Sequence, residues 1–433
     1  MHDLGCIVLC AGQGTRMKTK RPKVLHEAAG KALYAWSLDW ALALKANPIQ
    51  AVLGYEKEQV REGIENHYGK QVQTVVQDKQ RGTGHAVQVA FENLAPCKRV
   101  LVLYGDTPLL TLDTLKALCL LQENTKSEIS MLTAYVKNPF GYGRIVRDNN
   151  IKEIIEERNA SAEQKEITEI NPGIYVFDYE FLKAGLANLK PNEVTKELYL
   201  TDLIAQAQKP IGSIEVSDKE IVGVNDMVQL AKADRLLRRR INEEWMREGV
   251  EMLDYKTTYI DSEVKLSPGV VLEQGVILRG ACEIGPGVRI GAYSVLQDAK
   301  VGENSIVGPF ARLRPGAVLE SDCKIGNFVE VKKSHFGKGS KASHLAYIGD
   351  AEIGEACNIG AGTITCNYDG QKKHKTKIDN GVFMGSNATL VAPLHLGDSS
   401  YVGAGSVINQ DVPAKALGLG RARQENKKDW VKK

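Results

Sequence analysis

The chain has 433 residues, of which 43% are apolar, and its 56 basic and 53 acidic residues leave a formal net charge of +3. This length exceeds one ordinary hydrophobic core, so we expect two or three domains. The balanced charge excludes a global field suited to nucleic acid or to an anionic membrane, so any anion site must be local.

The eight cysteines show no CxxC pair and no histidines at zinc-finger spacing, which predicts reduced thiols. No apolar run approaches the roughly 20 residues that span a bilayer, and the first residues lack the pattern of a cleavable signal peptide. We therefore expect a cytoplasmic protein without stable membrane association or a nucleic acid partner.

The first half of the chain alternates strand-like apolar runs with helical stretches. This alternation predicts an α/β domain, Rossmann-like, with helices on both faces of a sheet. Candidate strands cover residues 4–11, 71–77, 99–104, 130–136 and 173–177, and candidate helices cover residues 83–91 and 112–121.

A glycine-rich turn follows the first predicted strand, in the segment LCAGQGTRM (residues 9–17). Gly12 and Gly14 let backbone N–H groups approach an anion closely, while Arg16 and Lys23 supply positive charge for phosphates. The glycine spacing alone also fits a tight turn without a ligand. If the turn bound no anion, the two cations beside it would have no negative charge to neutralise. Their presence therefore favours a phosphate site.

Two further features extend this nucleotide-site prediction. Gln77 ends a predicted strand and Gly82 begins the run GTGH that opens a helix, an arrangement suited to reading the edge of a base. Asp106, in YGDTPLL, stands where another strand stops, and ligands of open α/β sheets bind at the carboxyl ends of strands. Asp106 is thus a candidate metal ligand, with a turn aspartate before Thr-Pro as the alternative.

A long linking helix is predicted over residues 226–248, with Asn225 as N-cap and Gly249 just past its end. Apolar residues at i, i+4 spacing mark one face of it, namely Leu237, Ile241 and Trp245. The predicted division of the chain is residues 1–223, a linking helix over residues 224–250, and residues 251–433.

From about residue 260 onward, an aliphatic residue followed by glycine recurs every six positions, as in Ile284-Gly285 and Ile290-Gly291, with one-residue slips before Val301 and Ile353. This period predicts a parallel β-helix whose aliphatic columns stack into one core. A Gly-rich disordered tract is the alternative, but disorder has no reason to keep a periodic column. The register fails between residues 359 and 384, where the polar, basic segment 366–377 predicts a loop projecting from the coil.

Charged and polar residues concentrate between residues 312 and 368 of the repeats. Lysines and arginines on a β-helix surface suit a phosphorylated substrate, with solvated charge as the alternative. His344, in SHLAY, is a candidate general base, because imidazole has the unperturbed side-chain pKa nearest neutrality. The alternative is a hydrogen-bonded histidine without chemistry.

The segments LCAGQGTRM, RPKVL, QRGTGHA, YGDTPLL, GYGRI, EINPGIYVF and GVND resemble the sugar-nucleotide pyrophosphorylases. Together with the hexapeptide repeats, nearly the whole chain resembles the bacterial bifunctional enzymes that acetylate glucosamine 1-phosphate and uridylylate the product. The resemblance implies a left-handed β-helix and a homotrimer, with Mg²⁺, acetyl-CoA and UTP as cofactor and co-substrates. It also implies UDP-N-acetylglucosamine as the product, for peptidoglycan and lipopolysaccharide synthesis.

The resemblance also implies a role for individual residues. Those that bind UDP-N-acetylglucosamine are Leu9, Ala11, Gly12, Arg16, Lys23, Gln77, Gly82, Thr83, Tyr104, Gly105, Asp106, Gly143, Glu156, Asn171 and Asn225. Asp106 and Asn225 also hold Mg²⁺. The residues that bind glucosamine 1-phosphate are Arg314, Lys332, Tyr347 and Asn358, with His344 as general base. Those that bind acetyl-CoA are Ala361, Asn367, Tyr368, Lys373, Ser386, Ala404 and Arg421.

The chain departs from the family at two positions beside the nucleotide site, where the family usually has alanine at Cys10 and threonine at Pro172. Cys10 is small enough to leave the loop intact, whereas Pro172 removes one backbone N–H donor. The basic tail carries Trp430, which either packs on a neighbouring chain or hangs free. We expect partial packing.

Two alternatives to the bifunctional enzyme remain open. The β-helix could be a structural or allosteric module of a monofunctional sugar-1-phosphate nucleotidyltransferase, as in some ADP-glucose and GDP-mannose pyrophosphorylases; His344 and the NYDG segment argue against this. The chain could instead be a non-catalytic relative, like the pyrophosphorylase-like subunits of a translation exchange factor. Arg16, Lys23 and Asp106 argue against that, because an inactive site has no need for two cations around a carboxylate.

Overall fold

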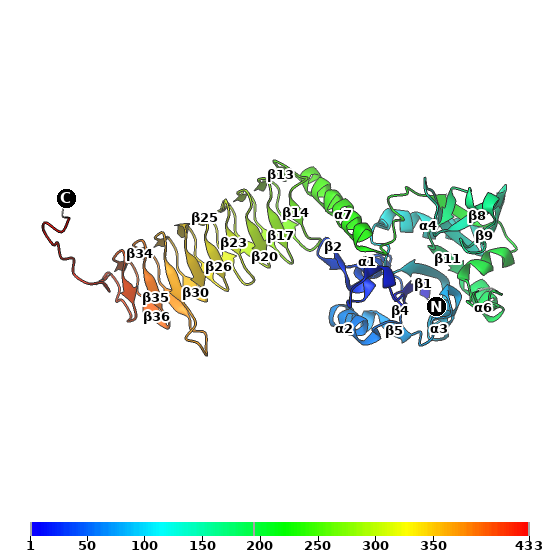
Figure 1. Cartoon of the computed structure of the whole chain (residues 1–433), viewed down its shortest axis with the longest axis horizontal. Helices are drawn as coiled ribbons and strands as arrows, with labels where there is room; N and C mark the ends of the chain where they lie inside the picture. The colour runs from blue at the N-terminus through cyan, green and yellow to red at the C-terminus, as the bar shows by residue number, and fades with distance from the viewer. Residues whose placement is uncertain (1, 194, 432–433) are drawn as a thin grey trace. The chain divides into compact units, whose positions relative to one another are not determined.

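The computed structural model describes residues 2–193 and 195–431 (Figure 1). The chain forms two compact units, Met1–Leu237 and Arg238–Lys433. The division falls inside helix α7 (Met227–Arg247), and the predicted three-part division with a separate linking helix stays a prediction. Within the described residues, no helix combines the length and the apolarity needed to cross a membrane.

The first unit contains a ten-stranded mixed sheet, in which four neighbouring strands run parallel in the order β5–β4–β1–β6. These strands are β1 (His2–Leu9), β4 (Ile49–Leu53), β5 (Gln73–Val76) and β6 (Cys97–Tyr104). The chain leaves β1 toward β4 and β5 and later returns to β6 on the other side of β1. The switch point lies between β1 and β6, where Leu9 pairs with Tyr104, and ligands of such sheets bind there.

The remaining strands extend the sheet beyond β6. They are β7 (Ile129–Tyr135), β8 (Gly143–Asp148), β9 (Asn150–Ile155), β10 (Glu169–Asn171), β11 (Tyr175–Asp178) and β12 (Gly212–Glu215). In the antiparallel pair β8–β10, Gly143 lies opposite Asn171. Two residues that the sequence assigns to the sugar site are therefore register partners.

Helices cover both faces of this sheet, as predicted. Alternate residues of β1 enter two different cores: Cys6 and Val8 pack with α1, α2 and α4, whereas Ile7 and Leu9 pack with α3 and α6. The helices are α1 (Leu33–Ala43), α2 (Lys57–Tyr68), α3 (Thr83–Glu92), α4 (Leu112–Thr125), α5 (Ala162–Lys165) and α6 (Tyr179–Ala187). The Rossmann-like α/β prediction is confirmed.

Helix α7 begins one residue later than the predicted N-cap implies. The side chain of Asp226, not Asn225, accepts the backbone N–H of Gln229 at 2.8 Å, the bond that defines an N-cap. The backbone N–H of Asn225 donates to Gln229 Oε1 at 2.7 Å. The N-cap prediction of Asn225 is thus wrong by one position, because Asp226 is the better placed acceptor, and the Asn225 side chain remains available to the nucleotide site.

The C-terminal end of α7 is formed as predicted. Gly249 has φ 90°, and its N–H donates to the carbonyl oxygen of Met246 at 3.2 Å. The N–H of Val250 donates to the carbonyl oxygen of Trp245 at 3.0 Å. This pair of bonds is a Schellman motif, which favours glycine at the left-handed position.

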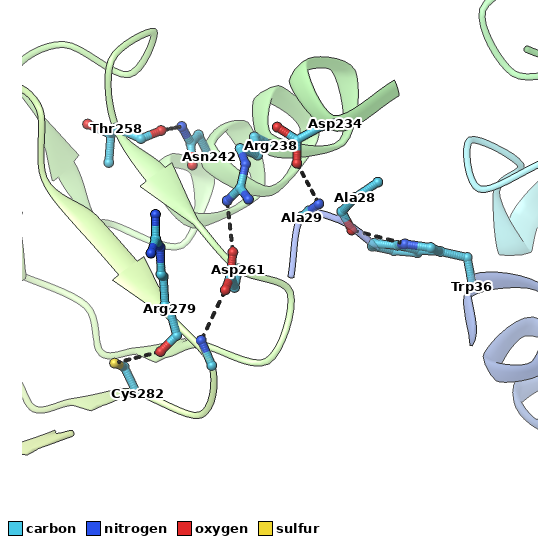
Figure 2. A network of polar contacts seen from close by, with 11 residues as sticks. Ala28, Ala29, Trp36, Asp234, Arg238, Asn242, Thr258, Asp261, Arg279 and Cys282 are labelled. Carbon is cyan, nitrogen blue, oxygen red and sulfur yellow. Dashed lines mark hydrogen bonds and ion pairs between the residues drawn. The ribbon is translucent and has the colours of Figure 1, made fainter. Parts of the chain in front are cut away.

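Polar contacts hold α7 within each unit (Figure 2). In the first unit, Asp234 accepts the backbone N–H of Ala29 at 2.7 Å. In the second unit, Arg238 donates to Asp261 at 2.9 Å, and both side chains are largely buried. Each part of α7 thus has a polar contact within its own unit.

The second unit is a left-handed parallel β-helix of hexapeptide repeats, which confirms the fold prediction (Figure 1). Three parallel sheets of ten, nine and eight short strands run along it, from β13 (Glu251–Met252) to β39 (Leu417–Gly418). Each strand pairs with the strand of the same sheet one coil further on, so that Ile277 pairs with Val295 and Val295 with Arg312.

The aliphatic column fills the interior of the coils, with Ile284, Ile325 and Met384 all at most 3% exposed. The column also passes through Phe336, which is fully buried and pairs with Leu319 of the preceding coil. A further one-residue slip therefore precedes Phe336. The aliphatic-glycine pattern does not show it, because phenylalanine occupies the column there.

The predicted loop projects from the coils between β32 (Ile364–Cys366) and β33 (Thr376–Ile378), which confirms the interruption (Figure 1). The loop is shorter at both ends than the predicted segment, residues 366–377. Thr365 is 1% exposed and occupies the core column before the loop. In this chain Trp430 is 76% exposed, and its packing on a neighbour stays a prediction.

Candidate functional site

A pocket of about 320 Å³ opens at the carboxyl ends of β1 and β6. The predicted residues that line it are Leu9, Ala11, Gly12, Lys23, Gln77, Gly82, Thr83, Tyr104 and Asp106. They come from the ends of three strands, from the short helix Lys23–Leu25 and from the start of α3. The structure therefore gathers the nucleotide-site motifs in one pocket at the switch point.

Lys23, Asp106 and Asn225 form a charged cluster in this unit. The Lys23 ammonium forms an ion pair with Asp106 and lies 3.3 Å from Asn225 Oδ1. The side chains of Lys23 and Asp106 are only 10% and 17% exposed. Val224 donates its backbone N–H to the carbonyl oxygen of Asp106 at 2.9 Å, which holds the segment before α7 against the end of β6. The two oxygens assigned to a metal thus converge on one positive charge.

The side-chain amide of Gln77 is held in one orientation. Its Nε2 donates to the carbonyl oxygen of Gly82 at 3.1 Å and lies 3.0 Å from His85 Nδ1. A carbonyl oxygen accepts but never donates, so the nitrogen of the amide must face Gly82. His85 Nδ1 is then the acceptor of the second amide hydrogen. This leaves Gln77 Oε1 as the group that faces a ligand.

The three residues assigned to the sugar lie together. A Cβ at Gly143 would be 3.7 Å from Asn171 Cβ and 3.8 Å from Glu156 Cδ. Burial raises the pKa of Glu156, whose carboxylate accepts a hydrogen bond from Thr201 at 3.0 Å. The backbone N–H of Gly173 donates to Asn171 Oδ1 at 2.9 Å. The side chain of Asn171 is thus fixed without an N–H from the proline at position 172.

Arg16 and Gly105 flank the pocket rather than line it. Arg16 is exposed on the short helix Thr15–Met17, in the loop that also carries Gly12. Gly105 is buried, and a Cβ there would lie 2.6 Å from Cys10 Sγ, so the turn after β6 requires glycine. Burial raises the pKa of Cys10 to about 12, which keeps this thiol protonated at neutral pH.

The sequence did not single out Gln80 or Glu197, which also line the pocket. Gln80 Nε2 donates to the carbonyl oxygen of Ala11 at 2.6 Å and ties the segment before α3 to the glycine-rich turn. No local signal marks these residues. Their roles depend on contacts between segments that are far apart in the chain.

In the second unit, basic residues gather along the ends of neighbouring strands. Lys332 ends β26 (Glu330–Lys332), and the N–H of Arg314 donates to Val331 of the same strand at 2.8 Å. Lys373, from the projecting loop, lies beside Lys332 and holds the pKa of Lys332 below its usual value, with a smaller effect of Arg314. Converging cations of this kind favour an anionic ligand.

His344 lies on one corner of the β-helix, at the end of β28 (Lys341–His344). The register of the following strands places Ala361, Ser386 and Ala404 at the same corner of successive coils. The N–H of Asn387 donates to Ala361 and that of Gly405 to Ser386, at 2.7 and 2.8 Å. Three of the residues assigned to acetyl-CoA therefore lie in line with His344 along this corner.

Several of the remaining assigned residues lie in the projecting loop or beside it. A Cβ at Gly349 would be 2.6 Å from Tyr347 Oη and 2.9 Å from Asn367 Nδ2, so these groups adjoin. Tyr368 is bridged to Lys373 across the loop. Asn358 starts β31 (Asn358–Ile359). Arg421 is exposed in the irregular segment after β39.

Three polar residues of this surface were not predicted. Glu330 accepts a hydrogen bond from Arg314 at 2.8 Å, and Asp350 accepts one from Asn367. Asn327 lies 2.7 Å from His344. Counting one coil back from a predicted residue would have located Asn327, because it is the register partner of His344.

Comparisons with known proteins define the class of both units. Residues 6–164 match the MobA-like NTP transferase domain, and residues 298–333 match six repeats of the bacterial transferase hexapeptide. The chain thus joins a nucleotidyltransferase to a hexapeptide-repeat acyltransferase.

Relatives named bifunctional protein GlmU match the chain over nearly its whole length. The relative from Trichlorobacter lovleyi is 45% identical, over 99% of this chain and 98% of the relative. Those from Thermosipho africanus and Carboxydothermus hydrogenoformans are each 44% identical, over 98% of this chain and 96% and 99% of the relatives. The chain therefore belongs to the family of bifunctional GlmU proteins.

Family membership favours the bifunctional prediction over a structural or allosteric β-helix. The chain is a nucleotidyltransferase and an N-acetyltransferase that acts on small-molecule substrates, nucleotides among them.

Proposed function

We propose that the second unit transfers the acetyl group of acetyl-CoA to glucosamine 1-phosphate. The first unit then transfers the uridylyl group of UTP to the resulting N-acetylglucosamine 1-phosphate and releases pyrophosphate. The observation that carries this proposal is that each unit has its own charged site. One is the cluster of Lys23, Asp106 and Asn225, and the other is the pair Lys332 and Lys373 on the β-helix that carries His344.

The orientation of Gln77 supports uracil as the base. Its amide hydrogens are engaged by Gly82 and His85, so Oε1 is offered as an acceptor. N3 of uracil carries a hydrogen and matches this acceptor, whereas N3 of cytosine is itself an acceptor and would be repelled. The residues assigned to the sugar, Glu156 and Asn171, both lie beside Gly143.

Mg²⁺ fits the donor set at this site. It prefers oxygen ligands and needs only one or two protein groups beside substrate phosphates. Asp106 and Asn225 offer a carboxylate and an amide oxygen that already converge on the ammonium of Lys23. Bound there, the ion supplies positive charge to phosphate oxygens. Lys23 is placed to donate to the same phosphates while the sugar phosphate attacks the α-phosphate in line.

For acetyl transfer, His344 accepts the proton of the substrate amine as this amine attacks the thioester carbonyl. Arg314 and Lys332 bind the phosphate of glucosamine 1-phosphate. Lys373 binds a phosphate of acetyl-CoA, and the anions relieve the repulsion that lowers the pKa of Lys332. The cofactor lies along the corner of the β-helix formed by the small side chains of Ala361, Ser386 and Ala404.

We further propose a cytoplasmic homotrimer. The thiols of the described residues are free, in keeping with a reducing compartment. An exposed aromatic ladder on the β-helix supports contact between copies: the rings of Tyr293 and Phe310, and of Phe310 and Phe328, stack 5.5 Å apart. Sedimentation equilibrium would return the mass of three chains, and a monomer would contradict the trimer.

The two reactions are separated by one assay. Glucosamine 1-phosphate, acetyl-CoA, UTP and Mg²⁺ are supplied, and the release of thiol and of pyrophosphate is followed separately. We expect thiol release without UTP, and pyrophosphate release only after acetylation. Absence of thiol release would overturn the proposal in favour of a structural β-helix.

A further inference from the structure

Asn327 and His344 occupy the same position on adjacent coils of the β-helix. They end β25 (Lys324–Asn327) and β28 and are register partners. Asn327 Oδ1 lies 2.7 Å from His344 Nδ1, the contact between their side chains. Asn327 is half-buried, whereas His344 is exposed, on the corner that also carries Ala361, Ser386 and Ala404.

Backbone contacts also hold the two coils together beside this pair. The N–H of Leu345 donates to the carbonyl oxygen of Asn327 at 3.0 Å, immediately beyond His344. A Cβ at Gly326 would lie 1.9 Å from the carbonyl oxygen of Ser343, so only glycine lets the two coils come this close. The two coils therefore approach each other closely at the residues that precede Asn327 and His344.

An amide oxygen can only accept a hydrogen bond. The contact with Asn327 Oδ1 therefore requires a hydrogen on His344 Nδ1 and leaves the lone pair on Nε2. A general base works best when a third group orients it and selects its tautomer.

We propose that Asn327 is a positioning residue for acetyl transfer, which makes Nε2 the basic nitrogen of His344. The proposal rests on the proposed function, in which His344 is the general base. The amine nitrogen of glucosamine 1-phosphate forms a bond to the acetyl carbon, and its proton passes to His344 Nε2. The bond between that carbon and sulfur then breaks, and the imidazolium returns the proton to the sulfur, so coenzyme A leaves as the thiol.

A neutral partner suits this base. A carboxylate at position 327 would stabilise the imidazolium, whereas an amide orients the ring without adding charge. The charged residues of the two strands are Lys324 and Lys341, both at the opposite strand ends, and the next strand of the sheet, β31, carries Asn358 and Ile359. Asn327 is therefore the polar group that acts on His344 most directly.

The test compares Asn327→Ala with Asn327→Asp in the full-length protein, by thiol release as a function of pH. Asn327→Ala should lower kcat for acetyl transfer about tenfold, the equivalent of one hydrogen bond to a developing charge. Asn327→Asp keeps an acceptor, so it should retain most of the activity and move the acid limb of the pH profile to higher pH. Asn380→Ala is the matched control, since it removes an amide oxygen that accepts the N–H of Glu355 at 2.8 Å elsewhere on the coils.

Two results would overturn the inference. One is an Asn327→Ala activity equal to that of Asn380→Ala. The other is an Asn327→Asp variant as impaired as Asn327→Ala with an unshifted profile, because Asn327 would then donate through Nδ2. Pyrophosphate release from N-acetylglucosamine 1-phosphate in the same preparations reports on folding. His344→Ala distinguishes a failure of this inference from a failure of the proposed function. Full acetylation by that variant would contradict the proposed function itself.

Discussion

Lys23 and Asp106 form a largely buried ion pair although 83 positions separate them in the chain. Asn225, a further 119 positions on, brings its Oδ1 within 3.3 Å of the same ammonium. Three segments thus meet at one point, namely the loop after β1, the turn after β6 and the residue that precedes the cap of α7. The nucleotide site therefore depends on the folding of the whole first unit and on the start of the helix.

The ion pair of Lys23 and Asp106 is expected to contribute to uridylyl transfer and not to acetyl transfer. Lys23→Ala should lower the kcat of pyrophosphate release by about 10²–10³, the usual cost of removing one preorganised donor, and leave thiol release unchanged. Lys98→Ala is the control, because Lys98 pairs with Asp3 on the surface, where both side chains are more than half exposed. An equal loss in both variants, or a loss of thiol release in Lys23→Ala, would show that the pair has no specific role.

His85 is expected to sharpen the choice of base. In His85→Ala, Gln77 keeps only the bond to Gly82, so its amide is less firmly held. The ratio of kcat/KM for UTP over CTP should fall about three- to tenfold, as expected for one neutral hydrogen bond. His67→Ala, on the exposed side of α2, should leave this ratio unchanged. An unchanged ratio in His85→Ala would mean that Gly82 alone orients Gln77.

Stability should depend on pH through Glu169. Burial opposes its ionisation, but hydrogen bonds from Arg147 at 2.7 and 2.6 Å outweigh burial and hold the pKa of Glu169 below its usual value. A lowered folded-state pKa stabilises the fold above the unfolded pKa of about 4.3, and this contribution is lost as the pH falls through the folded value. Glu169→Gln should therefore lower the thermal midpoint at pH 7, and the difference from the unmodified chain should shrink toward pH 3. A difference in thermal midpoint that stays the same at every pH would contradict the lowered pKa of Glu169.

The core column of the β-helix should tolerate a substitution that changes the shape of a side chain better than a substitution that leaves a cavity. Phe336 is fully buried between the coils, so Phe336→Ala should destabilise the β-helix by about 3–5 kcal/mol. Phe336→Leu keeps most of the apolar volume and should cost less. Thermal unfolding followed by circular dichroism ranks the two variants. Equal midpoints for both would show that position 336 is not part of the packed column.

The β-helix could be predicted in detail because its core pattern repeats at a fixed period. The one-residue slip before Phe336 could not be recognised from this pattern, because an aromatic residue occupies the aliphatic column there. In the first unit, α1 and β4 were not predicted, since residues 33–38 of α1 and all of β4 are buried and show no amphipathic pattern. Burial on all sides removes the periodic signal that marks an element.

The candidate sites were predicted unevenly for a related reason. The glycine-rich turn and Asp106 carry local signals of anion and metal binding, and both line the pocket. Gln80 and His85 act through contacts that only tertiary packing creates. Asn225 could be assigned only through the resemblance, because nothing near it in sequence marks its approach to Lys23.

The chain is expected to carry two active sites that work independently, and a mixture of two variants can show this. His344→Ala and Asp106→Asn are each supplied with glucosamine 1-phosphate, acetyl-CoA, UTP and Mg²⁺, first separately and then together. Neither variant alone should form UDP-N-acetylglucosamine, whereas the mixture should, because Asp106→Asn releases N-acetylglucosamine 1-phosphate that His344→Ala consumes. An inactive mixture would show that the two sites do not work independently, and so would a His344→Ala variant that releases no pyrophosphate when N-acetylglucosamine 1-phosphate is supplied directly.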